Sequence, residues 1–342
     1  MGLQPIEKIS PALKQGKNVS DLENKKITVL HIAGTGRNGS TLMERVLNEI
    51  PGVFAAGELN QWYWYKDQFC FCGKKIDECP VWGNLVNNDA TFKEIDKHFF
   101  ETRTKYCDRT NFIHFLIKKR MSDDFKQYLF SLRMLYSAIQ KNRACKVITD
   151  SSASLMYGYY LSLIPSIDLY VVHLVRDPRG FAHSLSQPKF RPNSNVSWSK
   201  IAALRGAFSA RVNPLRSALA WVRKNFFVEL VFSRKKGRYL RIHYEDFVEN
   251  PTKSLKEIGN MLGIKLEEHL DFIEDKKKVK LGMHHLTWGN VSAFEKGEEE
   301  IFLKVDNRWK RDMKLINIIF VTLITWPLLL KYFIVKMRKK QS

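Results

Sequence analysis

The chain has 342 residues, 44% of them hydrophobic, and carries a formal net charge of +21. A hydrophobic fraction of this size can fill a core, which excludes a chain that is disordered over most of its length. The charge favours an anionic ligand, an acidic polymer or an anionic lipid surface, but a generally solvated basic surface would also explain it.

Residues 1–25 are expected to form an N-terminal extension. The stretch MGLQPIEKIS lacks the apolar segment of a signal peptide, and Ile6 stands where N-myristoylation requires Ser or Thr. Residues 26–342 are expected to form a single domain, because no repeat and no Pro-, Gly- or Ser-rich linker interrupts them. We therefore expect a cytoplasmic protein, with membrane association left open.

Short apolar runs at 26–33, 146–149, 168–175 and 238–244 predict buried parallel strands. Helical patterns separate these runs, which is the alternation of a doubly wound α/β sheet. We therefore expect an α/β fold of the P-loop type, a three-layer sandwich in which helices flank a central parallel sheet.

Two longer segments between the predicted strands are expected to be helical insertions. Residues 88–145 are rich in Phe, Lys and Arg, and residues 186–235 begin as a loop and then become helical. Insertions at the carboxyl ends of parallel strands commonly carry substrate sites. We expect these two segments to frame the cleft for the molecule that the protein acts on.

The first predicted strand leads into a sequence similar to a phosphate-binding loop. Gly34 and Gly39 are followed by Ser40-Thr41, which is G-x-x-x-x-G-K-[ST] with serine in place of the lysine. A strand that turns sharply into a helix directs backbone N–H groups and the helix dipole at one point, and Arg37 adds a permanent charge. The loop can therefore bind a phosphate, but it lacks the lysine on which activation of a γ-phosphoryl group depends.

The third strand is followed by a second anion-binding candidate, in the stretch VVHLVRDPRGFAHSLS. Asp177 is a predicted helix N-cap and Pro178 a favourable first helical residue. Arg176 at the end of the strand and Ser184 in the helix can then converge on one phosphate. Alone, the sequence RDPR would more often be a surface turn with an ion pair.

Together the two motifs resemble those of sulfotransferases that use 3′-phosphoadenosine 5′-phosphosulfate (PAPS). GTGRNGSTL is similar to the 5′-phosphosulfate loop of that family, and the second motif to its 3′-phosphate-binding segment. Weaker similarity to bacterial and carbohydrate-type members extends over roughly residues 26–333. The resemblance implies transfer of a sulfuryl group from PAPS to an acceptor hydroxyl, with no metal ion. It assigns donor binding to Arg37, Asn38, Gly39, Ser40, Thr41, Arg176 and Ser184.

The same resemblance suggests a catalytic base. In carbohydrate and tyrosylprotein members a glutamate shortly after the first helix accepts the proton of the acceptor, and Glu58 in AAGELNQW matches that place. The alternative is that Glu58 caps the next helix. Among the histidines, His173 is expected in the core, whereas His183 and the pair His284-His285 have no supporting signal.

Three positions depart from the pattern of the family. Asn38 replaces a usual serine, Ala153 replaces a lysine after DSS, and Ala293 replaces an arginine before Phe294. Two missing cations leave open a non-catalytic relative that only binds PAPS. A P-loop kinase, with Asp150 holding Mg²⁺, is a further alternative that Ser40 disfavours.

Three of the five cysteines lie close together, at Cys70, Cys72 and Cys79. A structural zinc site needs four ligands and is one short here unless His98 or Cys107 joins, and a disulfide needs an oxidising compartment. We expect packing or local structure to explain this cluster, and therefore no metal site.

A C-terminal helix is expected at residues 313–337, around the 16 uncharged residues between Lys314 and Lys331. Such a run extends about 24 Å as a helix, short of a bilayer core roughly 30 Å thick, and Pro327 interrupts it. We expect this helix to dock on the protein, with peripheral membrane contact left open.

The expected partner is an acceptor that carries a hydroxyl group. The aromatic stretches NQWYWYKD and NVSWSK fit a glycan or an anionic or aromatic small molecule, and a hydrophobic alcohol equally well. We find no helix or strand motif for reading nucleic acid, and expect no such partner.

Overall fold

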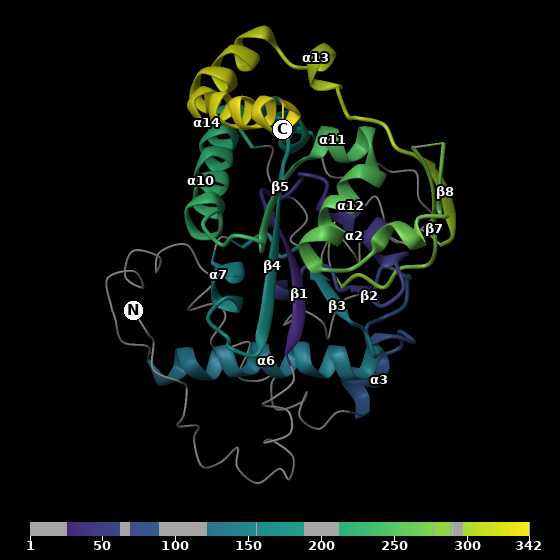
Figure 1. The fold of residues 1–342 in the computed structure, drawn as a ribbon. Helices are drawn as coiled ribbons and strands as arrows, with labels where there is room; N and C mark the ends of the chain where they lie inside the picture. Colours follow the sequence, from purple (N-terminus) through teal and green to yellow (C-terminus); the bar gives the residue numbers. More distant parts are fainter. Residues whose placement is uncertain are drawn as a thin grey trace.

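The computed structural model describes residues 26–61, 69–88, 122–154, 156–187, 212–275, 277–287, 289 and 297–341. Its centre is a five-stranded parallel sheet with the order β2-β3-β1-β4-β5 (Figure 1). The strands are β1 (Ile27–Gly34), β2 (Val53–Ala55), β3 (Val147–Asp150), β4 (Ile167–Val175) and β5 (Tyr239–His243). Four of them coincide with the predicted apolar runs, and helices cover both faces, which confirms the expected P-loop-type α/β sandwich.

The central strand β1 supplies both cores of the molecule. Ile27, Val29 and Ala33 belong to one buried cluster, whereas Leu30 and Ile32 belong to the other. Alternate side chains of a strand point to opposite faces, so a strand that is buried on both sides is apolar throughout. This double burial is why the run could be recognised from the sequence.

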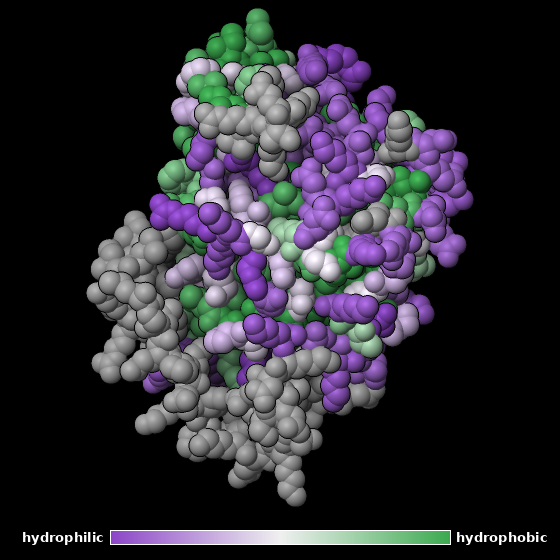
Figure 2. Space-filling model, in the orientation of Figure 1, coloured by the Kyte–Doolittle hydropathy of each residue, from purple (hydrophilic) through white to green (hydrophobic). Residues whose placement is uncertain are grey.

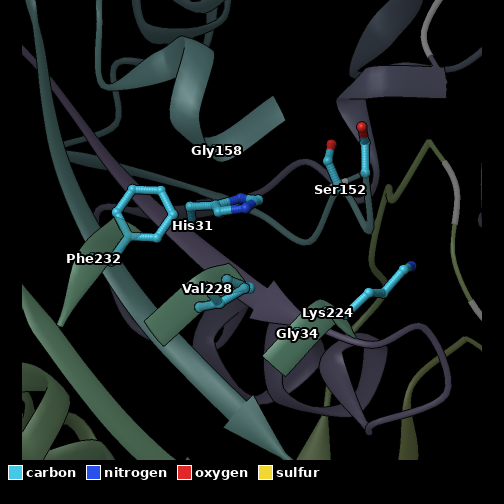
Figure 3. A pocket seen from close by; sticks show the side chains of 9 residues that line it. His31, Gly34, Ser152, Gly158, Lys224, Val228 and Phe232 are labelled. Carbon is cyan, nitrogen blue, oxygen red and sulfur yellow. The ribbon is translucent and has the colours of Figure 1, made fainter. Parts of the chain in front are cut away.

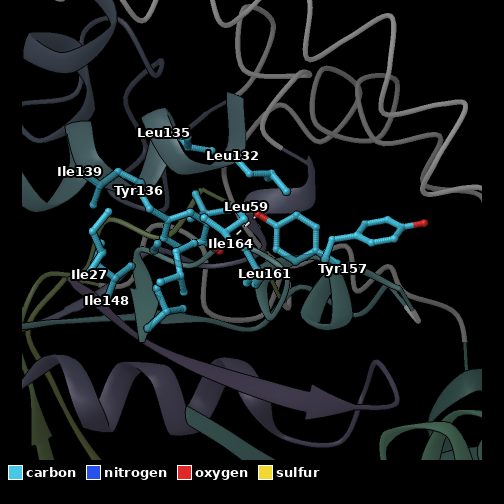
Figure 4. Close-up of a cluster of buried hydrophobic side chains, with 14 of the residues drawn as sticks. Ile27, Leu59, Leu132, Leu135, Tyr136, Ile139, Ile148, Tyr157, Leu161 and Ile164 are labelled. Atoms are coloured by element: carbon cyan, nitrogen blue, oxygen red, sulfur yellow. Dashed lines mark hydrogen bonds between the residues drawn. The ribbon is translucent and has the colours of Figure 1, made fainter. Parts of the chain in front are cut away.

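One face of the sheet is covered by the helices α6 (Asp123–Arg143), α7 (Tyr157–Leu161) and α10 (Pro214–Phe232). Ser122 accepts a hydrogen bond from the amide of Phe125 and caps α6, which then packs Tyr136 against the sheet (Figure 4). The short helix α3 (Trp82–Asn88) closes the edge of this cluster.

The opposite face is covered by α2 (Ser40–Asn48), α11 (Tyr244–Glu249) and α12 (Pro251–Leu262). The apolar face of α2 is buried, and Pro51-Gly52 follows the helix, as predicted. A small antiparallel sheet that the sequence did not predict packs on the same cluster, with the order β6-β7-β8. Its elements, with the preceding 3-10 helix, are η3 (Leu266–His269), β6 (Ile273–Glu274), β7 (Lys278–Leu281) and β8 (Glu299–Phe302).

The remaining helices are α8 (Pro178–Ser186), α13 (Trp309–Asp312) and α14 (Leu315–Gln341). The long helix α14 packs along α10 and α8 and buries Val321, Leu328 and Tyr332 (Figure 1). Its other side exposes a row of large apolar side chains: Leu315, Ile316, Ile319, Phe320, Leu323, Trp326, Leu330, Phe333 and Ile334. By length and composition, Leu315–Ile334 also qualifies as a candidate membrane span, with 22% of its most apolar window buried.

Several expectations fall outside the described residues. These are the N-terminal extension, most of the first insertion, the loop at 188–211, and the positions His98, Cys107 and Ala293. The helices α6 and α10 are the described parts of the two predicted insertions. The acceptor cleft that they were expected to frame therefore stays a prediction.

Candidate functional site

The predicted phosphate loop joins β1 to α2 in a conformation that requires its glycines. Gly34 has φ 139° and Gly39 has φ 99°, which is left-handed backbone. A Cβ atom at Gly34 would lie 2.6 Å from the carbonyl oxygen of Leu174, and one at Gly39 would lie 2.5 Å from the ring of Tyr244. The loop is thus packed between the end of β4 and the start of α11.

Asn38 braces this loop from inside. Its side chain is 1% exposed, donates from Nδ2 to the carbonyl oxygen of Leu174 (2.9 Å) and accepts at Oδ1 from the amide of Ser40 (3.1 Å). Both polar atoms of the Asn38 side chain are therefore bonded to backbone groups of the protein. Ser40 and Thr41 form the first turn of α2, where backbone N–H groups have no partner within the helix.

The two predicted anion-binding motifs meet at the ends of β1 and β4. Because Gly34 pairs with Leu174 in the parallel register, the residues that follow each strand lie side by side. Arg37 Nε donates to Ser184 Oγ at 3.0 Å, and Arg176 Nη1 donates to the carbonyl oxygen of Arg37 at 2.9 Å. Three side chains from two distant motifs thus form one basic cluster.

This cluster contains a further arginine that the sequence did not reveal. Arg176 Nη2 bonds to Asp306 at 3.0 Å, and Asp306 in turn accepts two hydrogen bonds from the guanidinium group of Arg308. Burial, together with Arg176 and Arg308, lowers the pKa of Arg37 from its usual value, and Asp306 partly opposes this. Three guanidinium groups around one carboxylate leave an excess of positive charge, which suits a phosphate or sulfate.

Arg176 is held by its neighbours rather than lying on the surface. Asp177 accepts a hydrogen bond from the amide of Arg179 and Pro178 is the first residue of α8, as predicted. The Arg176 carbonyl oxygen accepts from Trp221 Nε1 at 2.9 Å, and its guanidinium lies 4.8 Å from the ring centre of Tyr244. Within the RDPR turn the ion pair forms between Arg179 and Asp177, whereas Arg176 pairs with Asp306 outside the turn.

The sequence model described as "Sulfotransferase family" matches residues 30–268, more than half of the chain. The chain belongs to the sulfotransferase family. The match begins inside β1 and includes the phosphate loop and the Arg176 motif, which confirms the resemblance seen in the sequence.

Curated relatives include carbohydrate sulfotransferase 1 of Rattus norvegicus and of Mus musculus, each 33% identical over 107 residues. Each match covers 31% of this chain and 26% of the relative, so the chain matches about a quarter of their length. The protein of Danio rerio is 29% identical over 147 residues, 39% of this chain and 30% of that protein.

Among solved structures, the "Sulfotransferase Domain from the Curacin Biosynthetic Pathway" is 17% identical with a TM-score of 0.46, covering 89% of this chain and 97% of that chain. The "Sulfotransferase Domain from the Synechococcus PCC 7002 Olefin Synthase" is also 17% identical, with a TM-score of 0.43, covering 88% and 95%.

Glu58, the base of the sulfotransferase hypothesis, follows β2 in a tight turn. The carboxyl ends of β1 and β2 point the same way, two strand spacings or about 10 Å apart. The Glu58 backbone oxygen accepts a hydrogen bond from the backbone amide of Gln61. Two residues after Glu58, the backbone amide of Asn60 donates to the Ser152 hydroxyl at 2.9 Å. Glu58 is half-buried and begins a 3-10 turn, so the structure places it beside the segment that follows β3.

Beneath this turn lies a buried carboxyl group that the sequence did not reveal. Glu44 on α2 is fully buried and accepts hydrogen bonds from the amide of Gly57 (3.2 Å) and from the hydroxyls of Thr149 (3.3 Å) and Ser151 (2.5 Å). Burial raises the pKa of Glu44 to about 8, and the nearby carboxylates Asp150 and Glu58 add to this effect. Glu44 thus joins α2 to the strand ends that carry Glu58.

Asp150, the magnesium ligand of the kinase alternative, is occupied by the protein itself. Its Oδ2 accepts from the hydroxyl of Tyr136, and its Oδ1 accepts from the amide of Ser152 at 2.6 Å. Burial raises its pKa to about 6. Both oxygens are used within a buried network, an arrangement that supports the fold rather than a metal at a phosphate.

A small pocket lies at the carboxyl end of β1, between α7 and α10 (Figure 3). Gly34, Ser152 and Lys224 contribute to its lining, and Lys224 Nζ on α10 donates to the carbonyl oxygen of Ala153 at 2.9 Å. Helix α10 thus brings an ammonium group to the backbone of Ala153, the position at which the sequence resemblance leads us to expect a lysine.

The structure also places the four histidines that the sequence analysis weighed as a base. His173 is fully buried between the hydroxyl of Tyr239 and Asn225, both at 2.8 Å, and burial lowers its pKa to about 3, which confirms the predicted core position. His183 is buried in α8 beside Gln187. His284 packs against Phe71, and His285 lies among the clustered cysteines.

Proposed function

We propose that this protein transfers the sulfuryl group of PAPS to a hydroxyl group of an acceptor. The observation that carries the proposal is the convergence of Arg37, Arg176 and Ser184 at the end of a phosphate loop that lacks lysine. Membership of the sulfotransferase family supports the same reaction.

In this proposal the two motifs bind opposite ends of the donor. The first turn of α2, with Ser40 and Thr41, holds the 5′-phosphosulfate through backbone N–H groups, hydroxyls and the helix dipole. Arg176, Ser184 and Arg37 hold the 3′-phosphate through charge-assisted hydrogen bonds. The pocket beside Gly34 and Ser152 brings Lys224 near the group that is transferred, where positive charge stabilises the developing charge on the leaving phosphate.

The acceptor hydroxyl must lose its proton as it attacks the sulfur, and we assign that proton to Glu58. Glu44 and Ser152 fix the backbone on either side of it, at Gly57 and Asn60. Such a fixed backbone limits the positions that the Glu58 carboxylate can reach, as a general base requires. The acceptor class is a glycan hydroxyl, in line with the carbohydrate sulfotransferases that the chain resembles.

A donor comparison tests this function. Thermal unfolding is measured with PAPS, adenosine 3′,5′-bisphosphate, adenosine 5′-phosphosulfate and ATP at equal concentration, because a ligand that binds the folded state more tightly raises Tm further. We expect the two 3′-phosphorylated nucleotides to raise Tm most. A kinase would respond best to ATP with Mg²⁺.

Turnover is then measured with labelled PAPS and a panel of glycans and simple alcohols. Label transferred to a hydroxyl supports the enzyme. Tight PAPS binding without transfer to any acceptor would instead identify a non-catalytic relative, the second candidate that Ala153 favours.

A further inference from the structure

We propose that Cys70, Cys72, Cys79 and His285 bind a structural zinc ion. Their ligand atoms, three Sγ and one ring nitrogen, all lie within 4.8 Å of one another. Cys72 Sγ is 3.8 Å from Cys79 Sγ, while His285 Nδ1 is 3.6 Å from Cys70 Sγ and 3.3 Å from Cys79 Sγ. The fourth ligand that the cysteine spacing lacked is thus supplied from the far end of the sequence.

These three spacings are close to those of a tetrahedral zinc centre. With Zn–S bonds of about 2.3 Å and Zn–N bonds of about 2.0–2.1 Å, two sulfurs lie about 3.8 Å apart and a sulfur and a nitrogen about 3.6 Å apart. A disulfide would bring two sulfurs to about 2.05 Å, and the three cysteines are free thiols. Thiolate and imidazole ligands select zinc over magnesium or calcium.

The local backbone presents the first two cysteines side by side. Phe69 bridges to Lys75, and the amide of Cys70 donates to the carbonyl oxygen of Lys74 at 2.8 Å. Gly73, with φ 86°, makes the turn between them. The backbone amides of Cys72 and Lys74 hydrogen-bond to the sulfurs of Cys70 and Cys72, respectively, which fixes the positions of these two sulfurs.

The histidine ligand comes from a segment 206 residues beyond Cys79. Trp82 Nε1 donates to the His285 carbonyl oxygen at 2.5 Å, and the amide of Phe71 donates to the Leu286 carbonyl oxygen at 3.1 Å. These two hydrogen bonds hold the cysteine segment against the His285 segment, and the four ligand side chains meet between them. An arrangement with four protein ligands has no open position for a substrate, so its role is structural.

The zinc would hold in place the segment that carries His285, Thr287 and Gly289, which packs against the proposed donor site. Two residues after His285, the amide and hydroxyl of Thr287 donate to the carbonyl oxygen of Ala56, at 3.1 and 2.8 Å. Gly289 lies against Thr41, so a Cβ there would be 3.0 Å from the Thr41 hydroxyl. One ion would thus tie the cysteine loop to the segment that contacts both the Glu58 turn and the start of α2. This proposal does not depend on the reaction catalysed.

Metal content tests the proposal directly. Protein without a polyhistidine tag is purified without chelator, and its zinc is measured by inductively coupled plasma mass spectrometry. We expect one zinc per chain, released when a mercurial blocks the thiols. Cobalt substitution should give the absorption bands of a tetrahedral thiolate site, and X-ray absorption should show three sulfurs and one nitrogen around zinc.

Cys72→Ser and His285→Ala should each weaken zinc binding by more than the roughly 10- to 100-fold typical of outer-sphere changes. Cys145→Ser is the matched control, because Cys145 is a buried free thiol outside the cluster, and it should keep its zinc. If the ligand variants do not fold, the metal content and X-ray absorption of the unaltered protein decide. Protein that stays free of zinc after incubation with Zn²⁺, or a peptide map that joins Cys72 to Cys79 by a disulfide, would overturn the proposal.

Discussion

Glu44 couples the stability of this protein to pH. Burial raises the pKa of Glu44 to about 8 from an ordinary value of 4.5. At a pH between 4.5 and about 8, Glu44 is deprotonated in the unfolded chain but still protonated in the folded protein. The stability from this group is therefore complete below about pH 4.5 and is lost as the pH rises through about 8. Asp150, with its pKa raised to about 6, acts in the same direction over a lower range.

Replacement of Glu44 by Gln should remove the Glu44 part of this dependence. The amide keeps the shape and can still accept from Gly57 while donating to Ser151. Urea unfolding at about pH 5 and about pH 8.5 should show the variant gaining on the original protein at the higher pH by about 1–3 kcal/mol, since one pKa unit is about 1.4 kcal/mol. Parallel pH profiles would show that Glu44 titrates normally.

Arg176 is expected to discriminate between donors that differ in the 3′-phosphate. A charge-assisted hydrogen bond contributes about 1.5–3 kcal/mol, so Arg176→Ala should weaken PAPS about 10- to 100-fold. Adenosine 5′-phosphosulfate has no 3′-phosphate and should bind the variant as before. Calorimetric Kd values for both donors measure the ratio. Arg179→Ala, whose side chain pairs with Asp177, is the control, and an unchanged ratio in Arg176→Ala would refute the assignment.

Glu58 should affect turnover rather than donor binding. Loss of a general base costs roughly 10²- to 10⁴-fold in rate, so Glu58→Gln should reduce kcat by that factor while the Kd of PAPS stays nearly constant. Labelled-sulfate transfer and calorimetry give the two numbers. Glu249→Gln, at the exposed end of α11, should leave both unchanged. Near-normal turnover in Glu58→Gln would mean that another group accepts the proton.

At the scale of elements, the turn from β1 into α2 is the least tolerant part of the site. Gly39→Ala puts a methyl group 2.5 Å from the Tyr244 ring in left-handed backbone, and should lower stability by about 2–4 kcal/mol. Gly237→Ala is matched, because φ there is 73° and nothing lies within 4 Å, and should cost only about 1 kcal/mol. Denaturant unfolding of both variants makes the comparison, and equal losses would show that Tyr244 simply moves aside.

The sequence predicted the elements whose signal is local. Long apolar strands and the capped start of α8 were recognisable because a buried strand or an N-cap is encoded in consecutive residues. β2 was missed, since three residues at the edge of a sheet give too short a run. Glu44 carries no signal in the sequence, because only the neighbouring strand ends in the folded protein bury it. Lys224 and His285 join their sites from distant parts of the chain, which no spacing reveals.

At the scale of the whole molecule, α14 and the net charge suggest that the protein binds to a membrane surface. Apolar residues gather at the outer edge of the molecule over α14 and α10, and hydrophilic ones over α11, α12 and β8 (Figure 2). For α14 to cross a bilayer, Val321 and Tyr332 would have to leave the core, and large apolar side chains that α14 covers, such as Trp221, would be exposed to water at about 1.5–3 kcal/mol each. We therefore expect α14 to lie on a membrane surface rather than to span it.

Vesicle flotation and carbonate extraction test this expectation. The protein should bind anionic vesicles more strongly than neutral ones and should be removed by carbonate. Replacing Phe320 and Leu323, both exposed, by Asp should abolish binding, whereas Asp at the exposed positions Lys253 and Lys256 of α12 should weaken it only slightly. Resistance to carbonate would show that α14 inserts across the bilayer.

The packing of α14 also fixes when the donor site can form during synthesis. Tyr332 and Leu328 share a buried cluster with Val175 and Trp221, and Trp221 holds the carbonyl oxygen of Arg176. The packing that supports the Arg176 backbone is therefore incomplete until Tyr332 has left the ribosome, 156 residues after Arg176 itself. Chains are synthesised at roughly 5–20 residues per second. The phosphate loop is therefore made many seconds before the donor site is complete and can bind a nucleotide.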